Sequence, residues 1–161
     1  MFTLMIINKI HWLGVGLSSP PGILYLNDQR YDLIVWNRSV DKAETLLKNK
    51  INVNKLDISN FSKKLDKNDL IVSMLPASMH IEIVDLAIKH KCHIVTSSYY
   101  DPQYKKLESK FINNNCLFIC ECGLDPGIDH LLAHKLIREF EEGNHQDIKS
   151  IGFESMCGGF P

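Results

Sequence analysis

Short apolar runs alternate along the chain with stretches in which apolar residues recur every three to four positions. Short runs rich in branched residues predict buried strands, whereas the longer spacing predicts amphipathic helices. The two strongest strand patterns are DLIVW at 32–36 and DLIVSML at 69–75, which Pro76 ends. We expect five further strands, at 10–14, 52–58, 93–96, 116–120 and 148–153.

Helical patterns lie between these strands. They cover the segments 17–27 (a loop and then a helix), 41–50, 61–65, 79–90, 102–113 and 128–141. Ser78 and Asp101 precede two of them and are expected to act as N-caps, because a side-chain oxygen there accepts a hydrogen bond from a free helical amide. Pro102 suits the first position of a helix, where no intrahelical partner for an N–H is lost.

Strands that are apolar on both faces and are separated by helices form parallel sheets covered by helices on both sides. Connections between parallel strands are right-handed. We therefore expect an α/β protein with a doubly wound, mostly parallel sheet of six to seven strands, in a single domain over residues 1–161. Ligands of such sheets bind at the carboxyl ends of the strands, so the loops there are the first candidates for a site.

A glycine-rich loop, GVGLSSPPG, follows the first predicted strand. The pattern G-x-G-x-x-G at this place is typical of the Rossmann dinucleotide-binding fold, in which the first glycine makes a tight turn and the second lets the backbone approach a pyrophosphate. Gly14 and Gly16 take these positions, Ser19 stands at the third, and Gly22 comes three residues later. Ser18 and Ser19 are candidates to cap the next helix or to donate to a phosphate. The alternative is an ordinary turn with two glycines.

The second strand ends in Asn37, Arg38 and Ser39, and Lys42 lies one helical turn further on. Sites that prefer NAD carry an acidic residue here, about 20 residues after the glycines, to bind the ribose hydroxyls. That acid is absent, and a guanidinium suits a phosphate that a carboxylate would repel. The pattern favours NADP(H) over NAD(H); a surface arginine beside a loop is the alternative.

Composition excludes several classes of protein. The 18 basic and 19 acidic residues give a net charge of -1, which argues against a nucleic-acid partner. No apolar run approaches the roughly 20 residues that cross a membrane, and the segment 1–16 lacks the basic start and cleavage site of a signal peptide. Five cysteines are too few for a disulfide scaffold. We expect reduced thiols and a cytoplasmic location.

No metal site is expected. His130 and His134 stand four residues apart on one predicted helix, which is a metal-ligand spacing, but no third ligand accompanies them. A solvated helix face explains this pair better.

Four separate motifs resemble the saccharopine dehydrogenases of the saccharopine reductase type, which form L-glutamate with NADP(H). The most specific is ECGLDPGIDH at 121–130; SMLPA at 73–77, TSSY at 96–99 and CGGFP at 157–161 agree with it in family order. The resemblance runs from about residue 10 to the end of the sequence and also includes a variant of the family's glycine loop. It implies an oxidoreductase that interconverts saccharopine with glutamate and aminoadipate semialdehyde, in lysine metabolism.

The resemblance also implies roles for the matching positions. Pyrophosphate contacts fall to the glycine loop, ribose and phosphate contacts to the end of the second strand, and nicotinamide and substrate contacts to the later loops. The implied cofactor residues are Gly14, Gly16, Leu17, Ser18, Asn37, Arg38, Ser39, Ser73, Leu75, Pro76, Ser98, Leu124 and Pro126. The implied catalytic residues are Asp125, Tyr99 and Cys157.

Simple structural roles remain open for these residues. Asp125 also suits the cap of a helix beginning near Gly127, and Cys157 also suits a small buried apolar position. The sequence ends where the family's substrate and dimerisation domain begins, so we expect the cofactor-binding part, a small-molecule substrate and a possible homodimer. The alternatives are a stand-alone binding or regulatory module, a degraded-gene fragment, or another NADP oxidoreductase, because Asn-Arg-Ser after the second strand also resembles shikimate dehydrogenases.

Overall fold

The computed structural model describes residues 7–143, 148–156 and 158. Six strands form one parallel sheet in the order β3-β2-β1-β4-β5-β6. They are β1 (Ile10–Leu13), β2 (Leu33–Asn37), β3 (Val53–Lys55), β4 (Leu70–Ser73), β5 (His93–Thr96) and β6 (Phe118–Ile119). The order reverses between β1 and β4, which is the switch point of a doubly wound sheet. The predicted fold class is confirmed.

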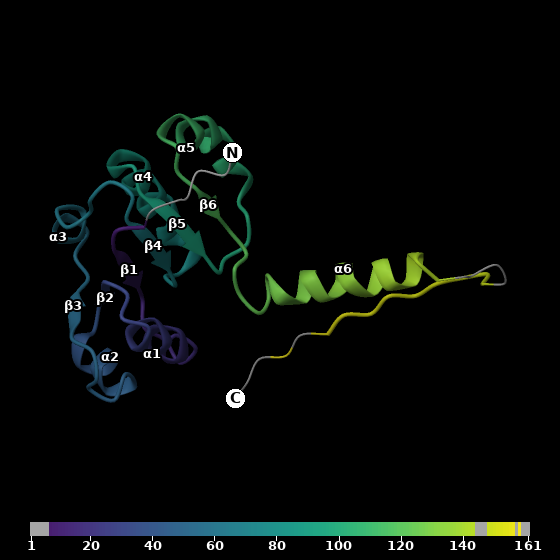
Figure 1. The fold of residues 1–161 in the computed structure, drawn as a ribbon, viewed down its shortest axis with the longest axis horizontal. Coiled ribbons are helices and arrows are strands. Elements are labelled where there is room, and N and C mark those ends of the chain that lie inside the picture. The colour runs from purple at the N-terminus through teal and green to yellow at the C-terminus, as the bar shows by residue number, and fades with distance from the viewer. Residues whose placement is uncertain (1–6, 144–147, 157, 159–161) are drawn as a thin grey trace.

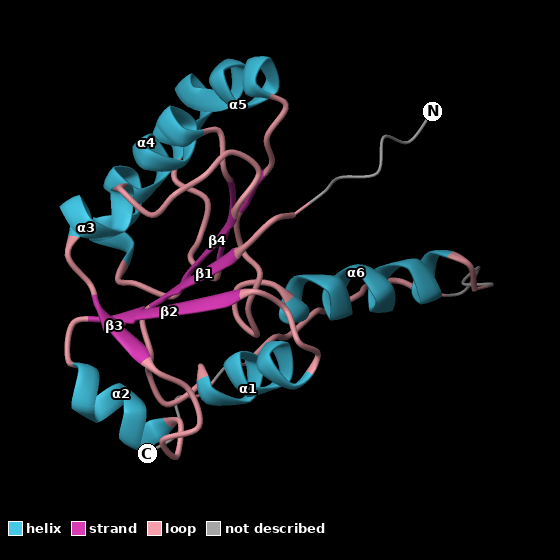
Figure 2. Ribbon diagram, turned by 60° about the vertical axis from the view of Figure 1, so that its left-hand side comes forward, coloured by secondary structure: helices cyan, strands magenta, loops and turns pink. Residues whose placement is uncertain are grey.

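Helices cover both faces of the sheet (Figure 2). One face carries α1 (Pro20–Asp28) and α2 (Val40–Leu46). The other carries α3 (Ile58–Ser62), α4 (His80–His90) and α5 (Glu108–Asn114). Two 3-10 turns, η1 (Ala77–Met79) and η2 (Pro102–Leu107), lead directly into α4 and α5.

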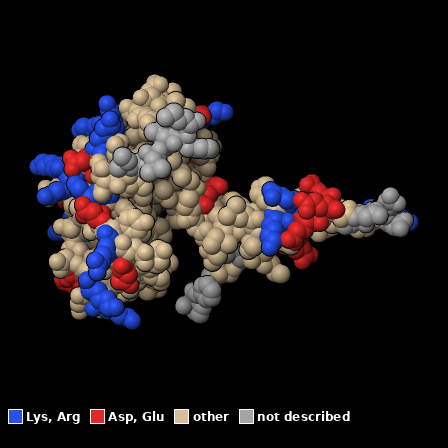
Figure 3. All heavy atoms as spheres, in the orientation of Figure 1, with Lys and Arg blue, Asp and Glu red and all other residues tan. Residues whose placement is uncertain are grey.

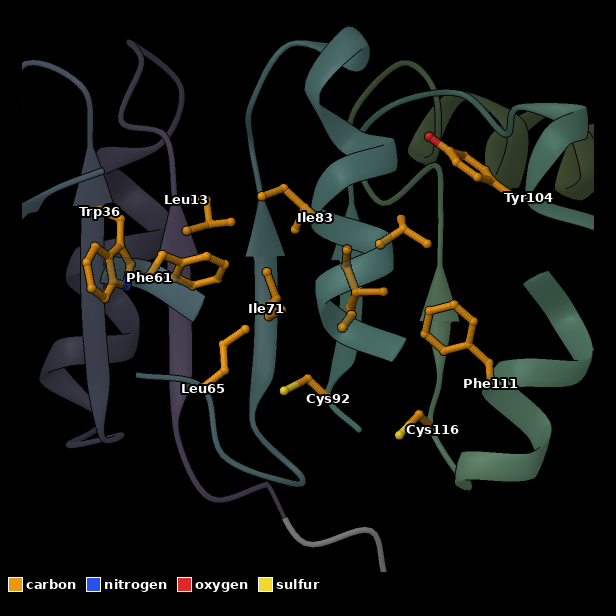
Figure 4. Close-up of a cluster of buried hydrophobic side chains, with 13 residues drawn as sticks. Leu13, Trp36, Phe61, Leu65, Ile71, Ile83, Cys92, Tyr104, Phe111 and Cys116 are labelled. Atoms are coloured by element: carbon orange, nitrogen blue, oxygen red, sulfur yellow. The ribbon is translucent and has the colours of Figure 1, made fainter. Parts of the chain in front are cut away.

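Each face has its own hydrophobic core. On the α3–α5 face, Leu13, Ile71 and Ile94 from the sheet pack beneath buried helical residues such as Phe61 and Ile83 (Figure 4). On the α1–α2 face, Trp12, Val35 and Val53 pack with Ile23, Ala43 and Leu47. Side chains alternate between the two faces along each strand, which explains why the strand sequences are apolar throughout.

A buried polar chain crosses the first of these cores. His11 Nε2 lies 3.1 Å from Asp69 Oδ2, and both side chains are fully buried. Trp36 Nε1 donates to His11 Nδ1 at 3.2 Å. Because Nδ1 accepts a hydrogen bond, the proton of the neutral imidazole is on Nε2 and points to the carboxylate.

The element boundaries differ from the sequence predictions at several ends. Asp101 caps η2 by accepting from the Gln103 amide at 2.9 Å, as predicted, but the segment from 102 is a 3-10 turn before it becomes α5. Ser78 does not cap α4, because it lies within η1 and α4 begins after Met79.

The last described helix, α6 (Ile128–Glu141), matches its predicted bounds and extends away from the sheet (Figure 1). The segment 148–156 returns beside it as irregular chain, so the predicted strand at 148–153 is wrong. That segment pairs with no strand among the described residues. None of the described helices combines the length and apolar character needed to span a membrane.

Candidate dinucleotide site

The glycine loop after β1 packs directly against the loop after β4. Gly14 has a φ of +90°, a conformation that favours glycine. A Cβ added to Gly14 would lie 2.9 Å from the Met74 carbonyl oxygen and 3.3 Å from a Leu75 methyl carbon. The tight turn predicted at Gly14 is therefore present, and it brings Gly14 against Leu75, another predicted cofactor residue.

Gly16 differs from Gly14, because no neighbouring atom in the described structure would clash with a side chain at this position. Its φ is not in the left-handed region, and an added Cβ would meet nothing within 4 Å. Gly16, Leu17 and Ser18 are all exposed. A glycine that faces open space beside such a turn fits the close approach of a phosphate group to the backbone.

The amide donors of this loop lie before the helix. Positions one and two of α1 are Pro20 and Pro21, which carry no N–H. The amides of Leu17 and Ser18 make no hydrogen bond within the described part of the chain. These two amides are therefore the free donors next to the open face of Gly16.

Ser19 does not cap α1 with its side chain. Its hydroxyl is buried, donates to the Gly14 carbonyl at 3.3 Å and accepts from the Gly16 amide at 3.4 Å. The expectation that Ser19 caps the helix is wrong, whereas its contact with a phosphate stays a prediction. Ser19 instead bridges the two glycines and stiffens the turn.

Gly22 takes over the packing role of the third glycine, which the sequence interpretation missed. A Cβ at Gly22 would lie 2.9 Å from the Trp12 ring on β1. The third glycine of the fingerprint serves close packing of helix against strand. No local pattern in the sequence signals this contact, because it forms only when α1 packs on β1.

The end of β2 is tied to the glycine loop. Asn37 Oδ1 accepts from the Val15 amide at 3.0 Å, and Asn37 Nδ2 donates to the Ser39 carbonyl at 2.9 Å. Arg38 and Ser39 are exposed, and no ion pair to Arg38 occurs among the described residues. Arg38 is thus the next residue after Asn37, which contacts the glycine loop directly. A site that binds both the pyrophosphate and the ribose phosphate requires these two segments to lie close together.

The predicted cofactor residues at the end of β4 differ in how far they are exposed. Leu75 is half-buried and Pro76 is exposed, whereas Ser73 is fully buried with an unpartnered hydroxyl. The Ser73 side chain therefore lies below the surface of this edge and does not line an open cleft.

The predicted catalytic pair meets at the carboxyl edge of β5 and β6. The Tyr99 hydroxyl donates to Asp125 Oδ1 at 2.6 Å. Ser98, Tyr99, Asp125 and Pro126 line a hollow of about 530 Å³ between the two loops. Two residues 26 positions apart in sequence are thus brought together by the parallel pairing of β5 and β6.

The loop before α6 holds Asp125 without using it as a cap. The amides of Ile128 and Asp129 donate to the carbonyls of Gly123 and Leu124, and the Gly127 amide donates to Asp129 Oδ1 at 2.7 Å. The start of α6 is thus held by the Asp129 side chain and by backbone hydrogen bonds, without a side-chain N-cap, and the Asp125 carboxylate accepts from Tyr99. The Asp125–Pro126 peptide bond is cis.

The described cysteines show no sign of a reactive thiolate. Cys92, Cys116, Cys120 and Cys122 are free thiols. Burial raises the pKa of Cys120 to about 11 and also raises the pKa of Cys122, so both thiols stay protonated near neutral pH. Cys157, a predicted catalytic residue, lies outside the described residues.

The helix histidines are solvated. His130 and His134 are both exposed, as expected, and His130 lies 3.6 Å from Glu121 Oε2. No group of three or more potential ligands for a metal ion is found among the described residues.

Along one edge of the sheet, the glycine loop after β1 contacts the loops after β2 and β4, and the loop after β5 contacts the loop after β6. A Rossmann sheet with a glycine turn, free loop amides and no acid at the end of β2 defines a dinucleotide-binding domain of the NADP-preferring class.

Comparison with known proteins agrees with this class and narrows it. The sequence model for the family described as "Saccharopine dehydrogenase NADP binding domain" matches residues 10–119. The chain therefore belongs to the saccharopine dehydrogenase NADP-binding domain family, and its cofactor is NADP. The resemblance found in the sequence is confirmed.

Individual relatives carry related names. Saccharopine dehydrogenase [NADP(+), L-glutamate-forming] from Schizosaccharomyces pombe is 36% identical over 155 residues, which cover 92% of this chain and 34% of that protein. Mitochondrial alpha-aminoadipic semialdehyde synthase from Bos taurus is 34% identical over 160 residues, or 95% of this chain and 17% of that protein. The apo structure of L-Glu-forming saccharopine dehydrogenase from Saccharomyces cerevisiae superposes with a TM-score of 0.71 at 34% identity, covering 83% of this chain and 31% of that one.

The chain therefore spans about a third of the length of its fungal relatives. The family assignment concerns the cofactor-binding region, which contains the whole sheet and the glycine loop.

Proposed function

We propose that this chain is the NADP(H)-binding part of an oxidoreductase that acts on the CH–NH group of saccharopine, in lysine metabolism. The observation that supports it best is the Tyr99–Asp125 hydrogen bond at the same sheet edge as the glycine loop. This arrangement offers a cofactor cradle and a polar substrate handle side by side.

In this proposal the glycine loop holds the pyrophosphate through the amides of Leu17 and Ser18, with Gly16 allowing close approach. Asn37 and Ser39 hold the adenosine ribose, and the Arg38 guanidinium binds its phosphate. Leu75, Pro76, Ser98, Leu124 and Pro126 flank the rest of the cofactor.

The substrate end of the site uses a carboxylate and a phenol. The Asp125 carboxylate stabilises positive charge on the substrate nitrogen, and the Tyr99 hydroxyl orients both the carboxylate and the substrate. When bound, NADP+ would supply the hydride acceptor for a carbon that carries the secondary amine of saccharopine. Both side chains are exposed in this structure, so we expect that this chain by itself does not oxidise saccharopine measurably.

A cofactor titration tests the proposal. NADPH should bind more tightly than NADH, and Arg38→Ala should weaken NADPH binding about 10- to 100-fold while leaving NADH nearly unchanged, because hydrogen bonds to charged groups contribute about 1.5–3 kcal/mol. Binding is measured from nicotinamide fluorescence. Arg138→Ala, an equal change of charge on exposed α6, is the matched control and should change neither affinity.

Equal binding of NADPH and NADH by the unaltered protein would contradict the proposed role of Arg38. Turnover of saccharopine by this chain would contradict the expectation that an exposed Tyr99–Asp125 pair is inactive.

We also retain the sequence predictions of a homodimer, of a cytoplasmic location and of no nucleic-acid partner. Lys, Arg, Asp and Glu are interspersed on the face of the sheet domain seen in Figure 3, which supports the last of these. The relatives from cattle and rodents are mitochondrial by name.

A further inference from the structure

A buried histidine lies beneath the candidate site and was not singled out in the sequence. His80 is the first residue of α4, and Thr96 is the last residue of β5. Both are about 1% exposed, and His80 Nδ1 lies 3.3 Å from Thr96 Oγ1. The contact joins the segment after β4 to the end of the neighbouring strand.

Thr96 carries a second contact that reaches the site itself. Its hydroxyl oxygen accepts from the Ser98 amide at 2.9 Å. The Ser98 carbonyl in turn accepts from the Glu121 amide at 3.0 Å. The backbone of Ser98 is therefore held on one side by Thr96 and on the other by the loop after β6.

The next residue along this backbone is Tyr99, whose hydroxyl binds Asp125. The direction of the Tyr99 side chain depends on where the backbone of Ser98 is fixed. A connected path thus runs from His80 through Thr96 and Ser98 to the Tyr99–Asp125 pair.

On its other side, His80 is close to the cofactor half of the edge. It follows η1, and the Met79 amide donates to the Pro76 carbonyl at 2.9 Å. Met74 and Leu75, just before this turn, pack against Gly14. His80 therefore lies between the segment that supports the glycine loop and the segment that carries Tyr99.

The burial of His80 has a cost for stability. His80 Nε2 is buried and makes no hydrogen bond of good geometry in the described part of the chain, although the Leu75 backbone lies close enough to act on the ring. Burial lowers the pKa of His80, with the backbone of Leu75 acting in the opposite direction, so the imidazole is neutral at neutral pH. A buried polar atom without a partner is a cost that an apolar residue of similar size would avoid.

We propose that His80 is a positioning residue for this site: through Thr96 it fixes the Ser98 backbone and so sets Tyr99 and Asp125 in register with the glycine loop. The functional meaning of that register rests on the proposed function, but the path itself is a property of the free protein.

Amide hydrogen exchange tests the path residue by residue. In His80→Leu, exchange of the Ser98 and Glu121 amides should accelerate about tenfold or more, because the Thr96 hydroxyl loses the partner that orients it. Exchange at Ile71, in the middle of β4, should stay unchanged or slow down, since the buried unpaired nitrogen is gone. A purely structural role for His80 would instead accelerate all three amides together.

Two conservative variants provide the matched comparison. His80→Asn keeps a polar atom near the position of Nδ1 and should restore slow exchange at Ser98. His80→Gln places its polar atoms near Nε2 and should behave like His80→Leu. Thr96→Val removes the acceptor outright, and adding His80→Leu to it should produce no further acceleration.

Unchanged Ser98 exchange in His80→Leu would overturn the proposal, as would equal exchange in the Asn and Gln variants. Faster Ser98 exchange in the His80→Leu, Thr96→Val double variant than in Thr96→Val alone would also overturn it. NADPH titration of the unaltered protein reports separately on the proposed function, because the exchange measurements need no cofactor.

Discussion

Two glycines of the same loop serve different purposes, and single substitutions separate them. Gly14→Ala should lower the free energy of unfolding by about 1–3 kcal/mol, because an added Cβ meets the Met74 carbonyl at a positive φ. Gly16→Ala should change that free energy by less than about 0.5 kcal/mol. It should nevertheless weaken NADPH binding about tenfold or more, because the Cβ fills the space left for the pyrophosphate.

Chemical denaturation and NADPH titration of both variants check this prediction. A strong loss of stability in Gly16→Ala with normal cofactor binding would show that Gly16 serves the fold and not the ligand.

Most residues of the candidate site were proposed from the sequence, and their role in binding stays a prediction. The residue types at Gly14, Asn37, Tyr99 and Asp125 were predicted, and the structure brings each of them to the expected edge. His80 escaped prediction because nothing in its local sequence distinguishes it from a helix residue. Its partner Thr96 comes from a different strand, and only the sheet brings the two together.

At the element scale, α1 packs on β1 through one close contact. Gly22→Ala should destabilise the protein by about 1–3 kcal/mol, because the new methyl group would overlap the Trp12 ring unless the helix shifts. Denaturant unfolding measures the loss. Gly152→Ala, where an added Cβ meets nothing within 4 Å, is the control and should change stability by less than about 0.5 kcal/mol. Equal effects of the two changes would contradict the packing role of Gly22.

The existence of the elements was predicted better than their boundaries. β5 and α6 match their predicted bounds, and every strand from β1 to β6 was expected. Helix starts were less accurate: α4 begins two residues after Ser78, since η1 first turns the chain at the end of β4. The segment 148–153 has the apolar residues of a strand but no partner strand among the described residues, and a strand without a partner is not stable.

Buried neutral histidines make the stability of the folded protein depend on pH. Burial lowers the pKa of His11, His80 and His93. His11 Nδ1 accepts from Trp36 and His93 Nδ1 accepts from the Leu117 amide at 3.1 Å, so protonation breaks both contacts. The unfolded chain then binds more protons than the folded chain below pH 6.5, and the free energy of unfolding falls as the pH drops.

Each of these histidines contributes a slope of up to about 1.4 kcal/mol per pH unit below its unfolded pKa of about 6.5. Urea unfolding between pH 7.5 and pH 5 should show this fall. His93→Asn keeps an acceptor for the Leu117 amide. It should remove the contribution of His93, up to about 1.4 kcal/mol per pH unit, from the slope. The exposed His134→Asn should leave it unchanged. A flat profile would contradict the neutral state of the buried rings.

The surface of α6 predicts self-association. Leu131, Leu132 and Leu136 are 70%, 56% and 57% exposed on this projecting helix. Exposed apolar residues gathered on one element promote contacts between molecules. Sedimentation at rising concentration should show association, and Leu132→Glu with Leu136→Glu should reduce it, whereas the exposed Lys135→Ala should not. A monomer at all concentrations would contradict the prediction.

Hydrophobic spacing and local backbone chemistry are enough to predict the order of strands and helices, the glycine turn and the candidate residues for binding NADP. Only the tertiary structure decided that Gly22 serves Trp12, that Asp129 and not Asp125 holds the start of α6, and that His80 reaches Tyr99 through Thr96. Those contacts join residues whose distance along the chain says nothing about their distance in space. Parallel strand pairing sets that spatial distance, since it aligns the carboxyl ends of β4, β5 and β6 at one edge.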